Sequence, residues 1–115
     1  MPYNRGDVVL VLFPDSNLVT AKRRPVLVVQ ADGLQTGLQQ TIVAMITSNM
    51  DRAGHVSRCA VSRSSPEGRQ MGLLTDSVVM TDNLATVLDR EIDRVIGRCA
   101  DTGAVDTALR RTLGV

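Results

Sequence analysis

The chain has 115 residues, with 13 Lys and Arg against 12 Asp and Glu and a formal net charge of +1. Domains that coat nucleic acid through bulk electrostatics usually have a pI above about 9, so this balance excludes that class. Aromatic residues make up 2% of the sequence, with one Tyr, one Phe and no Trp. This excludes proteins that stack successive bases of a single strand on aromatic rings. We expect one domain over residues 1–115, in which any nucleic-acid function depends on a local site.

Short apolar segments separated by turn residues predict β-strands in the first half of the chain. They cover residues 8–13, 26–29 and 41–47. Their continuous apolar runs suit strands that are buried on both faces. Residues 56–62 alternate between polar and apolar and predict a strand with one solvent-facing side, and residues 64–68 have the composition of a loop.

The second half predicts two further strands and two helical segments. Apolar residues from Leu73 to Met80 predict a fifth strand, and Val95 to Arg98 predicts a short sixth. Between them, residues 88–94 predict a single helical turn with Asp89 as its cap. An amphipathic helix is predicted to begin after Asp101 or Thr102 and to end at Gly114. Its expected apolar face is made of Val105, Ala108, Leu109, Thr112 and Leu113.

These elements predict a mainly β fold with a C-terminal helix (α+β). Short strands with one helix suggest a small, curled β-barrel or half-barrel whose end the helix plugs. The apolar run at residues 8–13 is far shorter than the roughly 18 residues that span a bilayer, and it has no signal-peptide cleavage site. We therefore expect a cytoplasmic protein without membrane contact, in which Cys59 and Cys99 are reduced, buried thiols.

The densest cluster of positive charge is Lys22-Arg23-Arg24, directly before Pro25. Most such triplets are solvated loops. Here, however, Pro25 keeps Arg24 out of the helical conformation and fixes it at the mouth of a strand. A guanidinium held in this way can make two parallel hydrogen bonds to a phosphate.

Two strand endings carry polar side chains. Thr47 and Ser48 end the third strand and are followed by Asn49, while Asp82 follows the fifth strand. Taken alone, such endings are common turn features. His55 has no Cys or carboxylate nearby at metal-ligand spacing, and no Gly-rich phosphate-binding motif is present, so we expect neither a metal site nor a cofactor.

Four segments, at residues 5–11, 23–29, 41–49 and 72–83, together resemble the MazF/PemK family of bacterial type II toxins in order and spacing. The match covers nearly the whole chain and weakens between about residues 50 and 70. The resemblance implies an SH3-like barrel and a homodimer. It also implies metal-independent, sequence-specific cleavage of single-stranded RNA such as mRNA, and inhibition by a cognate antitoxin with a disordered acidic tail.

By position, Arg24 matches the catalytic arginine of that family and Thr47 its catalytic threonine. Ser48 and Asp82 match residues that line the substrate groove in some members, and we expect Lys22, Arg23 and Asn49 to be further RNA contacts. In the implied reaction the 2′-hydroxyl of the substrate attacks the adjacent phosphate. Arg24 would neutralise the developing charge, and Thr47 would donate a hydrogen bond to the same oxygens or orient the 2′-hydroxyl.

Two departures from the family pattern leave alternatives open. The loop over residues 14–22 contains no Glu, and Ala85 stands where some members carry an arginine. Weaker RNA binding or a catalytically inactive binding module are therefore alternative interpretations. A sister toxin group that inhibits DNA gyrase is a further alternative, although the Trp typical of its C-terminus is absent here.

Overall fold

The computed structural model describes residues 3–14 and 19–115. Asp15 and the rest of residues 15–18, which belong to the loop predicted over 14–22, lie outside the described residues. The strands are β1 (Asp7–Pro14), β2 (Ala21–Val28), β3 (Gln40–Thr47), β4 (Arg58–Val61), β5 (Ser77–Leu88) and β6 (Ile92–Arg98). The helices are α1 (Pro66–Gln70) and α2 (Gly103–Leu113), with 3-10 turns η1 (Met50–Arg52) and η2 (Asp89–Glu91).

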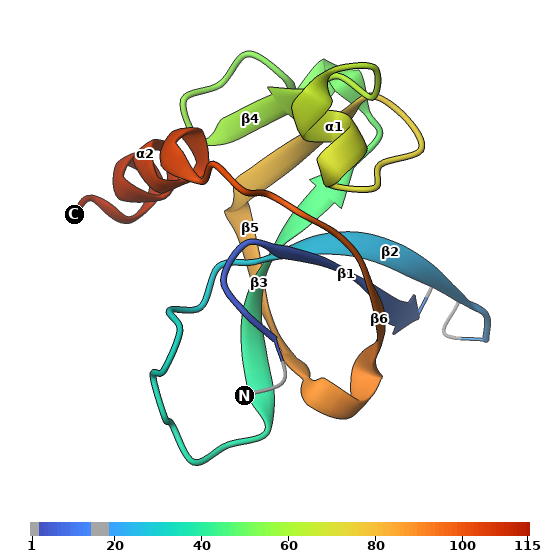
Figure 1. Ribbon diagram of the computed structural model, residues 1–115, viewed down its shortest axis with the longest axis vertical. Coiled ribbons are helices and arrows are strands. Elements are labelled where there is room, and N and C mark those ends of the chain that lie inside the picture. The colour runs from blue at the N-terminus through green and yellow to red at the C-terminus, as the bar shows by residue number, and fades with distance from the viewer. Residues whose placement is uncertain (1–2, 15–18) are drawn as a thin grey trace.

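The strands form one sheet in the order β4-β5-β3-β2-β1-β6, with antiparallel pairing between neighbours (Figure 1). The prediction of a mainly β fold with a C-terminal helix is confirmed. The expected closure into a barrel is wrong, because β4 and β6 remain at opposite edges of an open sheet. The segment that follows α1, and not β4 itself, contacts the edge strand β6. A Cβ at Gly72 in this segment would overlap the carbonyl oxygen of Ile96.

Both faces of the central strands are buried, as their apolar runs predicted. Successive residues of a strand point to opposite faces, and accordingly Val8 joins one apolar cluster and Val9 the other. The first cluster includes Val105 of α2, which packs on β4 and β5 rather than plugging the end of a barrel (Figure 1). Cys59 and Cys99 pack against this cluster as free, half-buried thiols. Burial raises the pKa of both thiols.

The charged triplet lies inside a strand and not in a loop or at its mouth. β2 begins at Ala21 because its pairing with β1 continues from Leu10 opposite Pro25 to Pro14 opposite Ala21. Backbone hydrogen bonding to β1 therefore fixes the positions of Lys22, Arg23 and Arg24.

Several predicted boundaries in the second half need correction. Ser65 caps α1 within the predicted loop, since its Oγ accepts a 3.0 Å hydrogen bond from the Gly68 N–H. β5 begins at Ser77 rather than Leu73 and continues to Leu88. The predicted turn over residues 88–94 is reduced to η2, because β6 already begins at Ile92. Asp89 is not its cap but accepts a 2.7 Å hydrogen bond from the Thr41 hydroxyl.

The C-terminal helix is confirmed, and it ends at Gly114, whose φ of 72° is left-handed. Val105 and Ala108 are buried as predicted, whereas Leu113, which was expected on the same apolar face, is 58% exposed. Within residues 3–14 and 19–115, no helix has the length and apolar character needed to cross a membrane.

Candidate active site

A groove of about 790 Å³ is lined by parts of all six strands, by η1 and by the segment that follows α1. It brings together Arg24, Thr47 and Ser48, which are far apart in the sequence. The cationic residues along it are Lys22, Arg23, Arg24, Arg52 and Arg58. Among the described residues that line the groove there is no Asp or Glu, so its described wall attracts anions.

Thr47 is the last residue of β3 and lies opposite Val78 of β5. Its Oγ1 accepts a 3.1 Å hydrogen bond from the backbone N–H of Asn49. A hydroxyl has one hydrogen and two lone pairs, so this contact fixes the oxygen while the hydrogen can be donated to a ligand.

Asn49 does not line the groove. Its Oδ1 accepts a 3.1 Å hydrogen bond from the Asp51 N–H and so caps η1. The turn that Asn49 starts carries Arg52, which does line the groove. The structure therefore gives Asn49 a role in positioning the backbone after β3, a role typical of Asn at the start of a helical turn.

A bulge in β5 shapes the far wall of the groove. Ala44 pairs with Leu84 but the next residue, Met45, pairs with Met80, which leaves residues 81–83 without a β3 partner. Such bulges bend a strand and redirect its side chains. As a result Asn83 lines the groove, whereas Asp82 does not.

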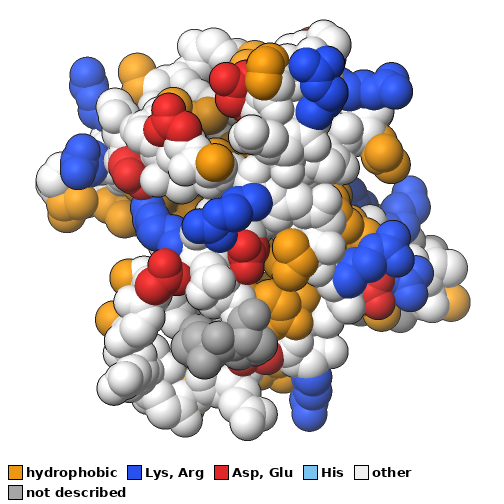
Figure 2. Space-filling model, viewed as in Figure 1, with side chains coloured by type: hydrophobic (Ala, Val, Ile, Leu, Met, Phe, Trp, Pro, Cys, Tyr) orange, Lys and Arg blue, Asp and Glu red, His pale blue; other side chains and the backbone are white. Residues whose placement is uncertain are grey.

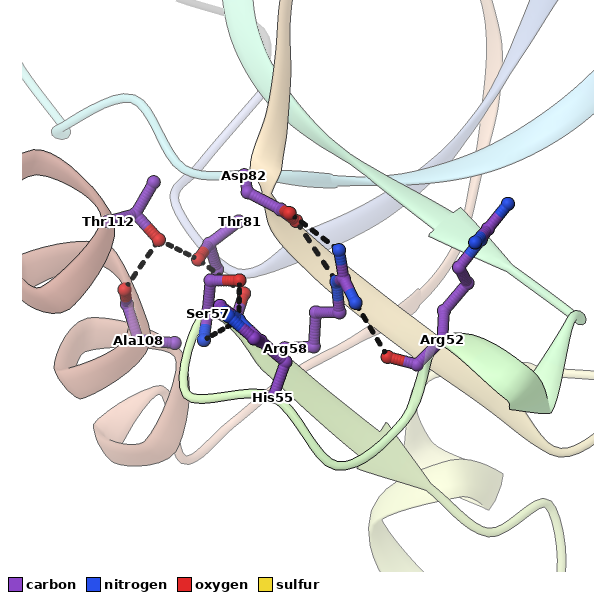
Figure 3. A network of polar contacts seen from close by, with 8 residues as sticks. All are labelled: Arg52, His55, Ser57, Arg58, Thr81, Asp82, Ala108 and Thr112. Carbon is purple, nitrogen blue, oxygen red and sulfur yellow. Dashed lines mark hydrogen bonds and ion pairs between the residues drawn. The ribbon is translucent and has the colours of Figure 1, made fainter.

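Asp82 holds Arg58 instead. The Arg58 Nη2 donates to Asp82 Oδ2 at 2.9 Å and Nε donates to Oδ1 at 3.4 Å, while Nη1 donates to the Arg52 carbonyl oxygen at 3.3 Å (Figure 3). The hydrogen bonds from Arg58 lower the pKa of the Asp82 carboxyl, which keeps it ionised. Arg58 is the first residue of β4, in a part of the chain where the family resemblance is weak. Neither Arg58 nor Arg52 was predicted as a site residue.

The backbone that carries Arg58 is fixed by a chain of polar contacts to α2 (Figure 3). The Thr81 hydroxyl donates to the Ser57 carbonyl oxygen at 2.6 Å and lies 2.8 Å from the Thr112 hydroxyl. His55 belongs to the same cluster, with its Nδ1 2.6 Å from the Ser57 hydroxyl. This histidine therefore has a structural partner and does not line the groove.

Arg23 lines the groove and is already part of an ion pair. The Arg23 guanidinium makes an ion pair of 3.2 Å with Asp93 on β6, so part of its charge is already neutralised.

Ala85, where some relatives carry an arginine, packs against the second apolar cluster and does not line the groove. Arg52 and Arg58 supply cations in the groove that were not predicted from the sequence.

Apolar and small polar side chains accompany the cations. The groove is lined as well by Leu73, Leu74, Met45, Met80, Ile96, Thr75 and Ser77. Apolar surface next to a few polar groups is typical of ligand-binding sites. On the face in Figure 2, Lys and Arg side chains lie in separate groups with Asp or Glu beside several of them, without a continuous basic surface. In the described part of the chain, no three His, Cys, Asp or Glu side chains gather as a metal site.

A family model for the PemK-like, MazF-like toxin of type II toxin-antitoxin systems matches residues 4–113. Among solved structures, an endoribonuclease in complex with its cognate antitoxin from a mycobacterial species has a TM-score of 0.72 at 23% identity, covering 98% of this chain and 96% of that one. The Mycobacterium tuberculosis toxin MazF-mt6 has a TM-score of 0.72 at 22% identity, covering 95% and 97%.

A third structure, MazE-MazF (Form-III) from Deinococcus radiodurans, has a TM-score of 0.71 at 16% identity, covering 100% and 99%. The search of curated proteins gives no match. At these identities the solved structures establish a shared fold, and the family model, which spans nearly the whole chain, establishes the family. This chain belongs to the PemK-like, MazF-like toxins of type II toxin-antitoxin systems.

Proposed function

We propose that the protein is an endoribonuclease toxin that cleaves single-stranded RNA in the groove holding Arg24 and Thr47. The observation that carries the proposal is the convergence of these two residues, from separate strands, on a groove with five described cations. The family match and the similar fold of structures described as endoribonucleases support this function over gyrase inhibition or an inactive binding module.

The proposed reaction uses the substrate's own 2′-hydroxyl as nucleophile and requires no metal ion. The 2′-oxygen forms a bond to phosphorus and loses its proton, while the bond from phosphorus to the 5′-oxygen breaks and that oxygen takes up a proton. One product ends in a 2′,3′-cyclic phosphate and the other begins with a 5′-hydroxyl. DNA lacks the nucleophile and is not cleaved.

Arg24 and Thr47 act on the phosphate in this proposal. Arg24 donates parallel hydrogen bonds to the phosphate oxygens as negative charge develops on them. Thr47 donates its hydroxyl hydrogen to the same group, with its oxygen already held by the Asn49 N–H. Arg24 acts as a fixed cation and not as a base, because an arginine guanidinium keeps its proton in proteins. Ser48, Lys22 and Arg23 contact the neighbouring backbone of the RNA.

The same groove is the proposed target of a cognate antitoxin. An acidic, disordered tail would be attracted by the cations along the described wall and would compete with RNA for them. Relatives of the same fold have been solved with an antitoxin, as in the mycobacterial complex and MazE-MazF. We further propose that the toxin acts as a homodimer in the cytoplasm, on mRNA.

Induced expression followed by mapping of transcript 5′ ends tests this function. We expect growth arrest and new 5′-hydroxyl ends at a shared short sequence, and neither effect with Arg24→Ala or Thr47→Ala. Inhibition of supercoiling by purified gyrase, with no new RNA ends, would instead support the alternative toxin class. Growth arrest by both variants would contradict the assigned site.

A further inference from the structure

We infer that Arg58 is a second phosphate-binding residue of the groove and that Asp82 is its positioning residue, so that the groove holds two phosphates of one RNA strand. This inference rests on the proposed ribonuclease function and extends it. It also changes the expected role of Asp82 from an RNA contact to a residue that acts through Arg58.

The hydrogen bonds of Arg58 leave part of its guanidinium available. Its contacts with Asp82 and the Arg52 carbonyl use three N–H groups. A guanidinium has five, so one N–H remains on each terminal nitrogen. The side chain is 23% exposed and lines the groove. Two N–H groups on adjacent nitrogens match the spacing of two phosphate oxygens.

Asp82 fixes the guanidinium without closing the site. Its two oxygens bond Nε and Nη2, which sets the plane of the guanidinium as well as its position (Figure 3). Asp82 itself stays out of the groove lining, where its charge would repel a phosphate. The lowered pKa of its carboxyl is consistent with a pair that stays ionised at neutral pH.

The backbone on both sides of the pair is held in place. Arg58 pairs with Met80 across β4 and β5, and the preceding residue, Ser57, accepts hydrogen bonds from both the N–H and the hydroxyl of Thr81. A guanidinium on such a support loses little further conformational freedom when it binds, which favours a specific contact over diffuse attraction.

Asp82→Asn separates positioning from bulk charge. The change removes one negative charge near the groove, so attraction by net charge alone predicts tighter RNA binding. If Asp82 positions Arg58, the same change weakens binding, because the amide offers a single acceptor oxygen and no charge to the guanidinium. The two explanations thus predict opposite signs for one substitution.

The experiment uses an RNA oligonucleotide that the wild-type protein cleaves, and measures kcat, KM and the salt dependence of affinity. Affinity is measured on the same oligonucleotide with a 2′-deoxy residue at the cleavage position. Arg58→Ala is expected to raise KM about ten- to hundredfold with a smaller change in kcat, the range expected for one hydrogen-bonded charge. The slope of log affinity against log salt should fall by about 0.7, as for one lost phosphate contact with a single strand.

Further variants keep the test informative if Arg58→Ala is unstable. Arg58→Lys preserves the charge but not the paired N–H groups, and it should also raise KM. Asp82→Asn should raise KM in the same direction. Arg63→Ala is the matched control, because Arg63 is exposed and does not line the groove; it should leave KM unchanged. A neutral methylphosphonate at one non-scissile phosphate should weaken wild-type binding but cause no further loss in Arg58→Ala.

The inference is overturned if the Arg58 variants match Arg63→Ala, or if Asp82→Asn binds RNA more tightly than the wild type. In either case the wild-type protein would still cleave RNA and Arg24→Ala would still be inactive, so only the roles of Arg58 and Asp82 would be refuted. If the wild-type protein cleaves no RNA at all, the proposed function itself fails, and the two failures are therefore distinguishable.

Discussion

The hydroxyl oxygen of Thr47 accepts a 3.1 Å hydrogen bond from the backbone N–H of Asn49, two residues further along the chain. A backbone group therefore holds the Thr47 hydroxyl oxygen in place, between the end of β3 and the start of η1. One lone pair is thereby occupied and the hydroxyl hydrogen is left for a ligand in the groove.

Substitutions at Thr47 should separate the hydroxyl from the shape of the side chain. Thr47→Ser keeps the hydroxyl and its bond from Asn49, and we expect it to retain kcat within about tenfold. Thr47→Val keeps the shape but has no hydrogen to donate, and we expect kcat to fall by about 10²–10³, the effect of losing one donor to a developing oxyanion. Single-turnover cleavage of an RNA oligonucleotide measures both. Equal rates for Ser and Val would exclude a role for the hydroxyl.

Arg24→Lys tests whether geometry or charge matters at the proposed catalytic cation. Lysine keeps the positive charge but cannot make two parallel hydrogen bonds, so we expect kcat to fall at least about a hundredfold. Because Arg24 is exposed on β2, the melting temperature should stay close to that of the wild type. A rate near the wild-type value would mean that Arg24 contributes only charge.

The pairing of Arg58 with Asp82 should be visible in a titration. In Arg58→Ala we expect the pKa of Asp82 to rise toward its ordinary value, because the hydrogen bonds from Arg58 are the main cause of its lowering. The pair stabilises the fold fully above the pKa that an Asp side chain has in the unfolded chain, about 3.9. This contribution is lost as the pH falls through the lower pKa of Asp82 in the folded state. NMR of the Asp82 carboxyl carbon measures the shift, and an unchanged titration curve would contradict the pairing.

Gly72 should be more sensitive to substitution than a glycine of similar conformation elsewhere. Its φ is +71°, and a Cβ there would overlap the Ile96 backbone. Gly33 has a φ of +68° with no atom within 4 Å of its Cβ position. Gly33→Ala should cost about 1 kcal/mol for the left-handed conformation alone. Gly72→Ala should cost about 1–3 kcal/mol more for the overlap, as measured by urea unfolding; equal losses would mean that this contact is unimportant.

The strands that were easiest to predict are those in which burial and sequence agree. β1 and β3 match their predicted ranges within one residue at each end, because continuous apolar runs suit strands covered on both faces. β2 begins five residues before the predicted apolar run, because its backbone pairing with β1 continues through the charged residues to Ala21.

Part of the candidate site was predicted, because some of its residues stand in recognisable local sequence patterns. Arg24, Thr47 and Ser48 stand in local patterns that resemble a family, and the fold brings them to one groove. Asn83 could not be predicted, because it reaches the groove through a bulge in β5 that only the pairing with β3 reveals. Arg58 could not be predicted either, because the carboxylate that holds it lies on a different strand. Asp82 was expected at the RNA because its position matches groove-lining residues of some family members, whereas in the structure it binds Arg58, 24 residues earlier.

The proposed cleavage of RNA by its own 2′-hydroxyl depends on one oxygen atom of the substrate, which a single 2′-deoxy substitution removes. Purified protein is mixed with an RNA oligonucleotide containing the mapped cleavage sequence, and with the same oligonucleotide carrying one deoxyribose on the 3′-oxygen side of the cleaved phosphate. We expect a 2′,3′-cyclic phosphate and a 5′-hydroxyl from the first oligonucleotide, and no cleavage of the second despite similar affinity. Cleavage of the substituted strand, or a product beginning with a 5′-phosphate, would contradict the proposed reaction.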